Sequence, residues 1–163
     1  MIEIKPAISQ SDFEIISQLA FIIWEEHYTK IIGSAQVTYM LNKYQTVSSI
    51  ESQVVEGYQY YLVYSNKTPV GYLSFIKKED AFFLSKIYVL SVERGKGIGK
   101  FMMEFLDKKA ADLNLQSISL TVNKKNTKSI DAYKKMGFAK IESIITDIGN
   151  GFVMDDFVMN KKI

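Results

Sequence analysis

The feature that most constrains the fold is a place where a predicted strand gives way to a predicted helix through three alternating glycines. These are Gly95, Gly97 and Gly99 in "YVLSVERGKGIGKFMMEFL", and an apolar pattern of helical period follows them. Glycine destabilises both strands and helices, so its repeated use here needs a physical reason. One interpretation is that N–H groups at the helix start hold the phosphates of a ligand, and the other is a flexible turn.

The hydrophobic pattern of the whole chain predicts an α/β (α+β mixed) fold. Strands are expected over 2–5, 58–64, 70–76, 81–90, 117–122, 138–148 and 152–160, and helices over 9–28, 35–55, 98–113 and 126–136. The strand–helix–strand segment 81–122 is long enough for a parallel, right-handed crossover. We therefore expect a mixed, mostly antiparallel sheet of about seven strands flanked by about four helices.

Length and composition narrow the possible classes of function. The 163 residues fit a single domain, 1–163, and the net charge of +2 gives no basic field to attract nucleic acid. Cysteine is absent and His27 is the lone histidine, which argues against a metal site or a cysteine nucleophile. No signal peptide or membrane span is recognised, so a cytoplasmic protein without a membrane partner is expected.

Two familiar phosphate-binding patterns do not fit the glycine stretch. The GxxxxGK[ST] pattern is missing because Phe101 follows Lys100. The dinucleotide pattern GxGxxG is missing because the spacing is GxGxG, and the next strand ends in Asn123, Lys124 and Lys125 where an acid is required. The binding of NAD is therefore not supported by the glycine stretch.

Two motifs resemble the GCN5-related N-acetyltransferases, the GNAT family. "RGKGIG" matches the family's [QR]-x-x-G-x-[GA] signature, and N-x6-Y-x3-G-F appears downstream as Asn126, Tyr133, Gly137 and Phe138. The resemblance covers residues 81–138, and the order of elements agrees over the whole chain. It implies a single-domain GNAT-like fold that uses acetyl-CoA and needs no metal.

The resemblance also implies roles for individual residues. The diphosphate of coenzyme A would lie on the loop, and its pantetheine arm would pair with the strand before the loop, where two parallel strands splay apart. Asn126 would contact the cofactor, and the Tyr133 hydroxyl would protonate the leaving sulfur as general acid. The expected cofactor-binding residues are Ile87, Tyr88, Val89, Arg94, Gly95, Lys96, Gly97, Ile98, Gly99, Lys100 and Asn126.

The base that would deprotonate the acceptor amine is not assigned. Many family members carry a glutamate on the strand before the asparagine, where this chain has Thr121. Candidates are Glu25, Glu26 and His27, because the first helices usually flank the acceptor site in this family. The competing interpretation of "WEEHY" is a helix end with solvated charges.

The acceptor is expected to be the amine of a small molecule. Asp147, Asp155 and Asp156 give the last predicted hairpin an acidic character that suits a cation such as a polyamine, although such acids also cap turns and protect sheet edges. A protein N-terminal or lysine acetyltransferase and a non-catalytic CoA-binding module remain alternatives. Because the apolar strand "FVMDDFVM" offers a pairing surface, both a monomer and a homodimer fit.

Overall fold

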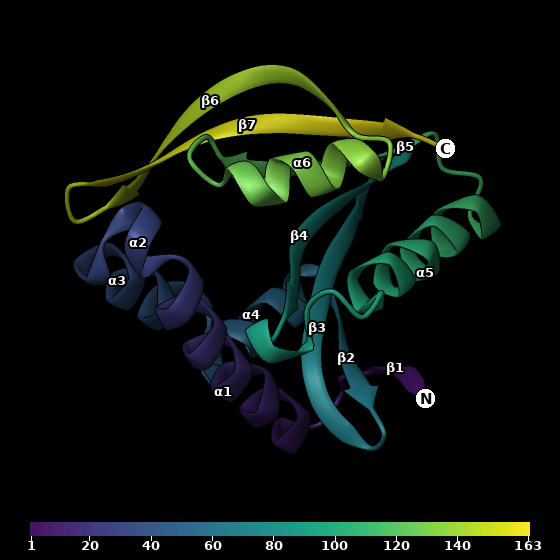
Figure 1. Ribbon diagram of the computed structural model, residues 1–163, viewed down its shortest axis with the longest axis horizontal. Helices are drawn as coiled ribbons and strands as arrows, with labels where there is room; N and C mark the ends of the chain where they lie inside the picture. The colour runs from purple at the N-terminus through teal and green to yellow at the C-terminus, as the bar shows by residue number, and fades with distance from the viewer. The chain divides into compact units, whose positions relative to one another are not determined.

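The computed structural model describes residues 1–163 as seven strands and six α-helices (Figure 1). The strands are β1 (Ile2–Pro6), β2 (Gln59–Ser65), β3 (Thr68–Lys78), β4 (Ala81–Val89), β5 (Ser117–Asn123), β6 (Ala139–Gly149) and β7 (Phe152–Lys162). The helices are α1 (Gln10–His27), α2 (Thr29–Ile32), α3 (Ser34–Tyr44), α4 (Val47–Glu56), α5 (Ile98–Asp112) and α6 (Thr127–Lys135). The sheet order is β1-β2-β3-β4-β5-β7-β6, which confirms the predicted mixed sheet of seven strands.

The helix count differs from the expected four because the predicted helix 35–55 is split. α3 ends at Tyr44, and Thr46 starts α4 by accepting the Ser49 N–H on its side-chain oxygen at 3.1 Å. The short helix α2 precedes α3. It is ended by Gly33, whose φ of 85° departs from helical geometry. The apolar period runs on through these breaks, so it did not reveal the capping that interrupts the helix.

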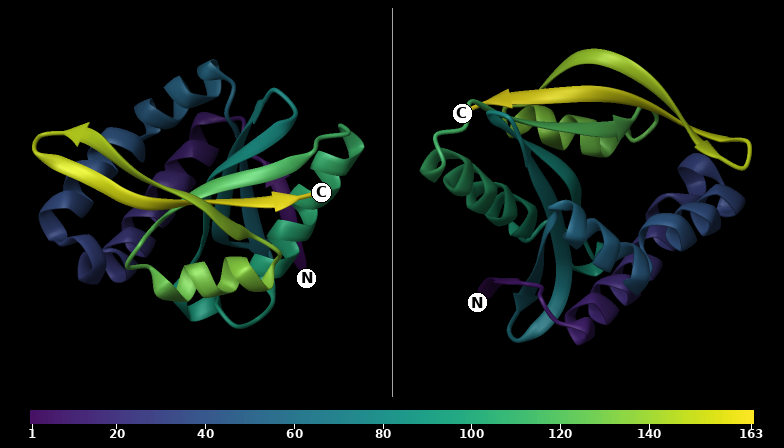
Figure 2. Two further views of the ribbon diagram at one scale, coloured as in Figure 1. Left: turned by 90° about the horizontal axis from the view of Figure 1, so that it is seen from above. Right: turned by 180° about the vertical axis from the view of Figure 1, so that it is seen from behind.

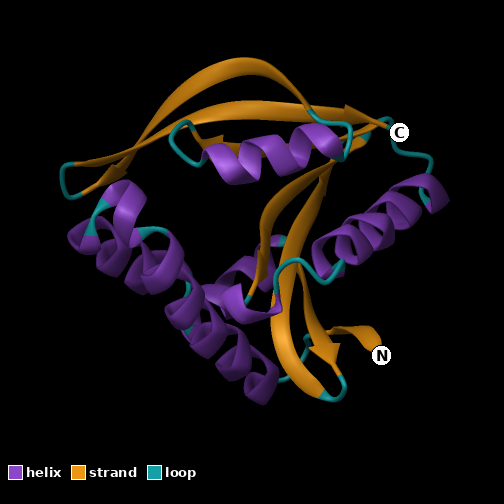
Figure 3. Ribbon diagram, in the orientation of Figure 1, coloured by secondary structure: helices purple, strands orange, loops and turns teal.

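By contact density the chain consists of two compact units. The first unit comprises Met1–Ile76 and Lys86–Met102. In it α1 packs on α2, α3 and α4, and Figure 3 shows these helices gathered together. The buried side of α1 carries Phe13, Ile16, Leu19, Ala20, Ile23 and Trp24, the helical spacing that the sequence predicted. β1 pairs antiparallel with β2, and β2 with β3.

The second unit comprises Lys77–Ser85 and Met103–Ile163. Its strands β5, β7 and β6 pair antiparallel, and α6 runs along one face of them (Figures 1 and 2). Ile118, Leu120 and Val122 are buried on that face of β5. An ion pair of 2.7 Å between Asp107 and Lys161 joins the last turns of α5 to β7.

The parallel pairing between β4 and β5 is short. It consists of Ala81 with Ser117, Phe82 with Ile118 and Phe83 with Ser119. β4 continues to Val89 and β5 to Asn123 without further pairs between the two strands. All three pairs lie within the second unit.

A close backbone contact fixes β4 where it approaches the glycine stretch. A Cβ atom added to Gly71 on β3 would lie 2.4 Å from the Tyr88 carbonyl oxygen and 3.3 Å from the Val89 Cα. Just beyond, the Leu90 N–H donates to the Val70 oxygen at 2.9 Å. Gly71 had no predicted role, although a single glycine inside a strand pattern is the usual signal of such an approach.

Replacing Gly71 by alanine tests this contact. We expect Gly71→Ala to lower the free energy of unfolding by about 1–3 kcal/mol, because the new methyl group must displace backbone rather than a flexible side chain. Denaturant unfolding measures the change, with Thr68→Ala at the exposed start of the same strand as the control. An unfolding midpoint equal to that of the wild type would contradict the close contact.

Candidate functional site

The glycine loop belongs to the first unit and joins a short 3-10 turn, Ser91–Glu93, to α5. Gly95 and Gly97 have φ angles of +78° and +81°, in the region that side chains disfavour. Gly99 has no such angle, and a Cβ atom there would meet nothing within 4 Å. Backbone conformation therefore explains the first two glycines, whereas a side chain at position 99 would meet only open space.

The start of α5 presents backbone donors beside this loop. The Phe101 N–H makes the first intrahelical bond, to the Gly97 oxygen at 3.0 Å. The N–H groups of Ile98, Gly99 and Lys100 precede it and point out of the N-terminus of a 15-residue helix. Together with the helix dipole, such donors favour an anion of the size of a phosphate.

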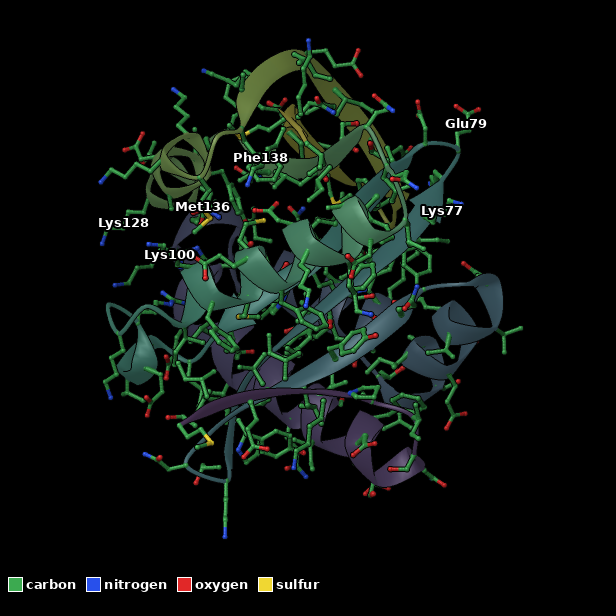
Figure 4. The ribbon with its side chains drawn as sticks, turned by 90° about the vertical axis from the view of Figure 1, so that its right-hand side faces the viewer. Lys77, Glu79, Lys100, Lys128, Met136 and Phe138 are labelled. Atoms are coloured by element: carbon green, nitrogen blue, oxygen red, sulfur yellow. The ribbon has the colours of Figure 1, made fainter.

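Two charged side chains of the loop are held by its neighbours. The Arg94 Nε donates to the Val89 oxygen at 3.2 Å, which ties the loop to the end of β4. Lys96 forms an exposed ion pair with Glu93 at 3.1 Å. Lys100 lies at the start of α5 (Figure 4). All the predicted loop residues from Arg94 to Lys100 thus lie in one continuous segment that follows β4.

The last residues of β4 alternate between its two faces. Tyr88 points toward α1, where its ring lies 5.9 Å from that of Trp24 and 5.4 Å from that of Tyr72 on β3. Tyr28 extends the cluster, 4.5 Å from Trp24. Of these four residues, only Tyr88 was predicted from the sequence. The spacing of Trp24 and Tyr28, four residues apart at a helix end, was the signal for the other rings.

A second unpredicted feature is the buried ammonium group of Lys86, also on β4. Its side chain is 7% exposed and donates to the Gln53 Oε1 and to the Tyr60 hydroxyl, both at 2.8 Å. No carboxylate pairs with it, and burial lowers its pKa to about 8. Burial also raises the pKa of the Tyr60 hydroxyl, which donates to the same Gln53 oxygen.

Tyr133 lies on α6 of the second unit, and Asn126 is the residue immediately before that helix. Asn126 is buried at the N-cap, and its backbone oxygen accepts the Ile130 N–H at 3.0 Å. The Tyr133 ring lies 5.8 Å from that of Phe138, and Gly137, with φ of 103°, ends the helix. Lys128 points away from α6 into solvent (Figure 4). The structure therefore groups the predicted loop and β4 residues in one unit and the predicted Asn126 and Tyr133 in the other.

The three acidic residues of the last hairpin differ in what they do. Asp147 accepts the Gly149 N–H at 2.8 Å and so stabilises its own turn. Asp155 pairs with Lys124 at 2.7 Å. Asp156 is buried instead, and its pKa is raised to about 6, mainly because burial disfavours the charged carboxylate.

The predicted candidates for the base have their own surroundings. The Glu26 Oε2 accepts the Ser91 hydroxyl at 2.6 Å, while Glu25 is exposed. The His27 ring stands edge-on to Tyr28 at 4.8 Å. Thr121 is exposed on β5. No group of three or more His, Cys, Asp and Glu side chains is arranged to hold a metal ion. None of the helices has the length and apolar character that crossing a membrane requires.

Comparison with known proteins identifies a family. The model of the acetyltransferase (GNAT) family matches residues 17–138. A search of curated proteins finds no significant match.

Several solved structures share the fold. The PaiA N-acetyltransferase from Thermoplasma acidophilum in complex with coenzyme A is 20% identical, with a TM-score of 0.84 over 100% of this chain and 99% of that one. A GCN5-related N-acetyltransferase from Rhodopseudomonas palustris is 15% identical, with a TM-score of 0.83 over 99% and 95%. A chimera of the spermidine N-acetyltransferase SpeG from Vibrio cholerae and hSSAT is 19% identical, with a TM-score of 0.72 over 99% and 95%.

The buried Lys86 predicts a pH-dependent stability. Because its pKa is lowered in the fold, the unfolded chain binds more protons between about pH 8 and 10.5, so stability must rise with pH in that window. Relative to Lys86→Met, we expect the wild type to gain on the order of 2–3 kcal/mol across the window. Denaturant unfolding at several pH values measures the gain, and Lys128→Met, an exposed lysine, is the control. A stability difference that stays constant with pH would contradict the lowered pKa.

Proposed function

Because this chain belongs to the acetyltransferase (GNAT) family, and so is an N-acetyltransferase that uses acetyl-CoA, we propose that its acceptor is a primary amine of a small molecule. The amine would attack the thioester directly. One observation carries the proposal. β4 leads into a glycine loop, and the absence of side chains on its glycines leaves space beside the N-terminal N–H donors of α5.

The residues of this segment fit coenzyme A. The backbone of Gly95 to Lys100 supplies donors for the diphosphate, and the open space at Gly99 allows it to approach them. The backbone of Ile87, Tyr88 and Val89 follows the three residue pairs that join β4 to β5, so a chain of amides can pair with it as an added strand. Arg94, Lys96 and Asn126 complete the proposed cofactor-binding set.

The protein's own contribution to the chemistry is positioning and proton transfer. Bound acetyl-CoA supplies an acetyl group activated as a thioester. Backbone N–H groups of β4 would stabilise negative charge on the thioester oxygen. The Tyr133 hydroxyl would give its proton to the departing sulfur. We assign Tyr133 this catalytic role and require no metal.

The same proposal covers the organisation and setting of the chain. The family match runs from residue 17 to 138 and so includes segments of both units, which supports one N-acetyltransferase domain over 1–163. We also propose a cytoplasmic enzyme without nucleic-acid or membrane partners; the net charge of +2 provides no basic field that would attract nucleic acid. A monomer and a homodimer are both compatible with it.

A polyamine is the acceptor that we test first. The fold is shared with a chimera that includes a spermidine N-acetyltransferase, and the last hairpin carries acidic residues. Asp147 already accepts a hydrogen bond within its own turn, and Asp155 is paired with Lys124. The case for a cationic acceptor therefore rests on Asp156. Proteins with amino-terminal or lysine amines are the alternative acceptors. A non-catalytic CoA-binding module is the alternative without turnover.

Thiol release from acetyl-CoA with a panel of amines tests the enzyme and its proposed acid together. We expect the wild type to release CoA when primary amines are supplied. Di- and polyamines should react faster than monoamines that carry no second positive charge. Tyr133→Phe should keep the affinity for CoA and lose turnover by about 100-fold, because the general acid is gone. Unchanged turnover in Tyr133→Phe would contradict the role of Tyr133 as general acid. Equal rates with all amines would contradict a polyamine as the acceptor.

Gly99→Leu tests the diphosphate site, with Gly99→Ala as its matched control, because the family signature accepts either glycine or alanine at this position. Because the position is helical and open, both variants should leave stability unchanged or raise it by about 0.5–1 kcal/mol. The leucine side chain would stand where the phosphates approach, so Gly99→Leu should lower the affinity for CoA, whereas Gly99→Ala should keep it. Calorimetric titration with CoA and thermal unfolding measure the two effects. A Gly99→Leu variant that binds CoA as tightly as Gly99→Ala would contradict the proposed site.

A further inference from the structure

β7 turns the side chain of Asp156 to the sheet face opposite α6. The register pairs Asp156 with Asn123 on β5 and with Ile144 on β6, and residues paired in this way share a face. α6 covers the other face, since its last turn reaches Lys161: a Cβ atom at Gly137 would lie 3.4 Å from that side chain. Successive residues of a strand alternate, so Lys161 and Asp156 point in opposite directions.

On its face Asp156 is a buried carboxylate without a partner. The residue is 6% exposed, whereas Thr121 on the same face is exposed. Its neighbour Asp155 points to the α6 side, where Lys124 pairs with it at 2.7 Å. No hydrogen bond or ion pair in the structure involves the Asp156 side chain. Burying a charge in this way is costly unless a cation or a donor is supplied from outside.

The position of Asp156 connects it with the proposed chemistry. It faces Asn123, the last residue of β5, and the Asn126 N–H donates to the Asn123 oxygen at 2.9 Å as the chain turns into α6. Thr121 pairs with Val158, which places Asp156 diagonally across from Thr121 on one face. Many family members carry a glutamate at the position of Thr121. The Asp156 carboxylate lies one strand away from that position, on the same face of the sheet.

We propose that the Asp156 carboxylate binds the ammonium group of the acceptor and takes its proton, as the base of the N-acetyltransfer. This inference rests on the proposed function and identifies the acceptor as a cationic amine. An alkylammonium offers three N–H donors and a positive charge, which are what this buried carboxylate lacks.

The proton and electron changes of this step balance. The ammonium gives one proton to Asp156, and the lone pair that this leaves on nitrogen forms the new C–N bond. The C–S bond breaks, its electron pair goes to sulfur, and the sulfur takes the Tyr133 proton. The nitrogen then loses its second proton, which restores Tyr133, while Asp156 releases its proton to solvent. The products are an amide, a thiol and one proton.

The ionisation of Asp156 suits the role. With a pKa raised to about 6, the group is ionised at neutral pH yet more basic than an ordinary carboxylate. The charged groups around it on the second unit are few. Asp155 and Lys124 lie on the opposite face; the charge of Asp155 adds to the rise in the pKa of Asp156, and the charge of Lys124 opposes it. Glu142 is an exposed carboxylate on β6 opposite Val158. Asn123 and Thr121 on β5 do not titrate.

Asp156→Asn tests the inference, because asparagine keeps the shape and cannot take the proton. With the cationic amines that the wild type acetylates, kcat/KM at pH 7 should fall by about 100-fold or more. The rise of kcat/KM around pH 6 should disappear from the pH profile. The affinity for CoA should stay unchanged, and stability at pH 7 should not fall, since a buried charge without a partner is removed. Glu142→Gln, which removes the same charge from the same face, should retain activity within about threefold.

A second variant keeps the test decisive. Adding Thr121→Glu to Asp156→Asn returns a carboxylate to the same face and should restore at least about tenfold of the lost activity. If Asp156→Asn keeps wild-type kcat/KM and pH profile while the wild type is active, the inference is wrong and the proposed function stands. If Glu142→Gln loses as much activity as Asp156→Asn, the effect is general electrostatics and the inference is wrong. A wild type that binds CoA but acetylates no amine overturns the proposed function, and the inference with it.

Discussion

The structure depends on the early end of the parallel pairing between β4 and β5. Three residue pairs join these strands, and each strand then continues without pairing to the other. Backbone N–H and C=O groups that leave a ladder need another partner, either water or a ligand. β4 reaches its end under the close contact of Gly71 with the Tyr88 carbonyl, so its backbone is held in place without help from β5. A strand fixed on one side can bind a chain of amides on the other.

The glycine loop extends the same arrangement. Gly95 and Gly97 turn the chain through conformations that other residues avoid, and Arg94 anchors the turn to the Val89 oxygen. The start of α5 is therefore held near the end of β4. Its first N–H groups have no acceptor within the helix. The proposed site asks β4 to pair with amides and the start of α5 to hold an anion, which are the two parts of coenzyme A, an amide chain that ends in a diphosphate.

The fold and the place of the glycine loop between a strand and a helix followed from the sequence, whereas the buried charged residues did not. Alternating strands, the crossover helix and the glycine spacing are local patterns, and each appears near its predicted place. The split of the helix 35–55 depends on the Thr46 cap, which the hydrophobic period does not report. Lys86 and Asp156 look like ordinary charged residues in sequence. Their burial comes from strand register and from neighbours such as Gln53 and Tyr60, distant in the chain.

Two buried charged residues without an ion-pair partner, one in each unit, bear on what the protein binds. Lys86 costs less to keep, because Gln53 and Tyr60 accept its hydrogen bonds and its lowered pKa makes the neutral form accessible. Asp156 has no hydrogen bond or ion pair of its own, and among the nearby charges only that of Lys124 favours its ionised form. A carboxylate in this state destabilises the folded protein near neutral pH, where it must be ionised. A structural role would be served as well by asparagine, so the residue is best explained by a cation that arrives from outside and leaves a proton behind.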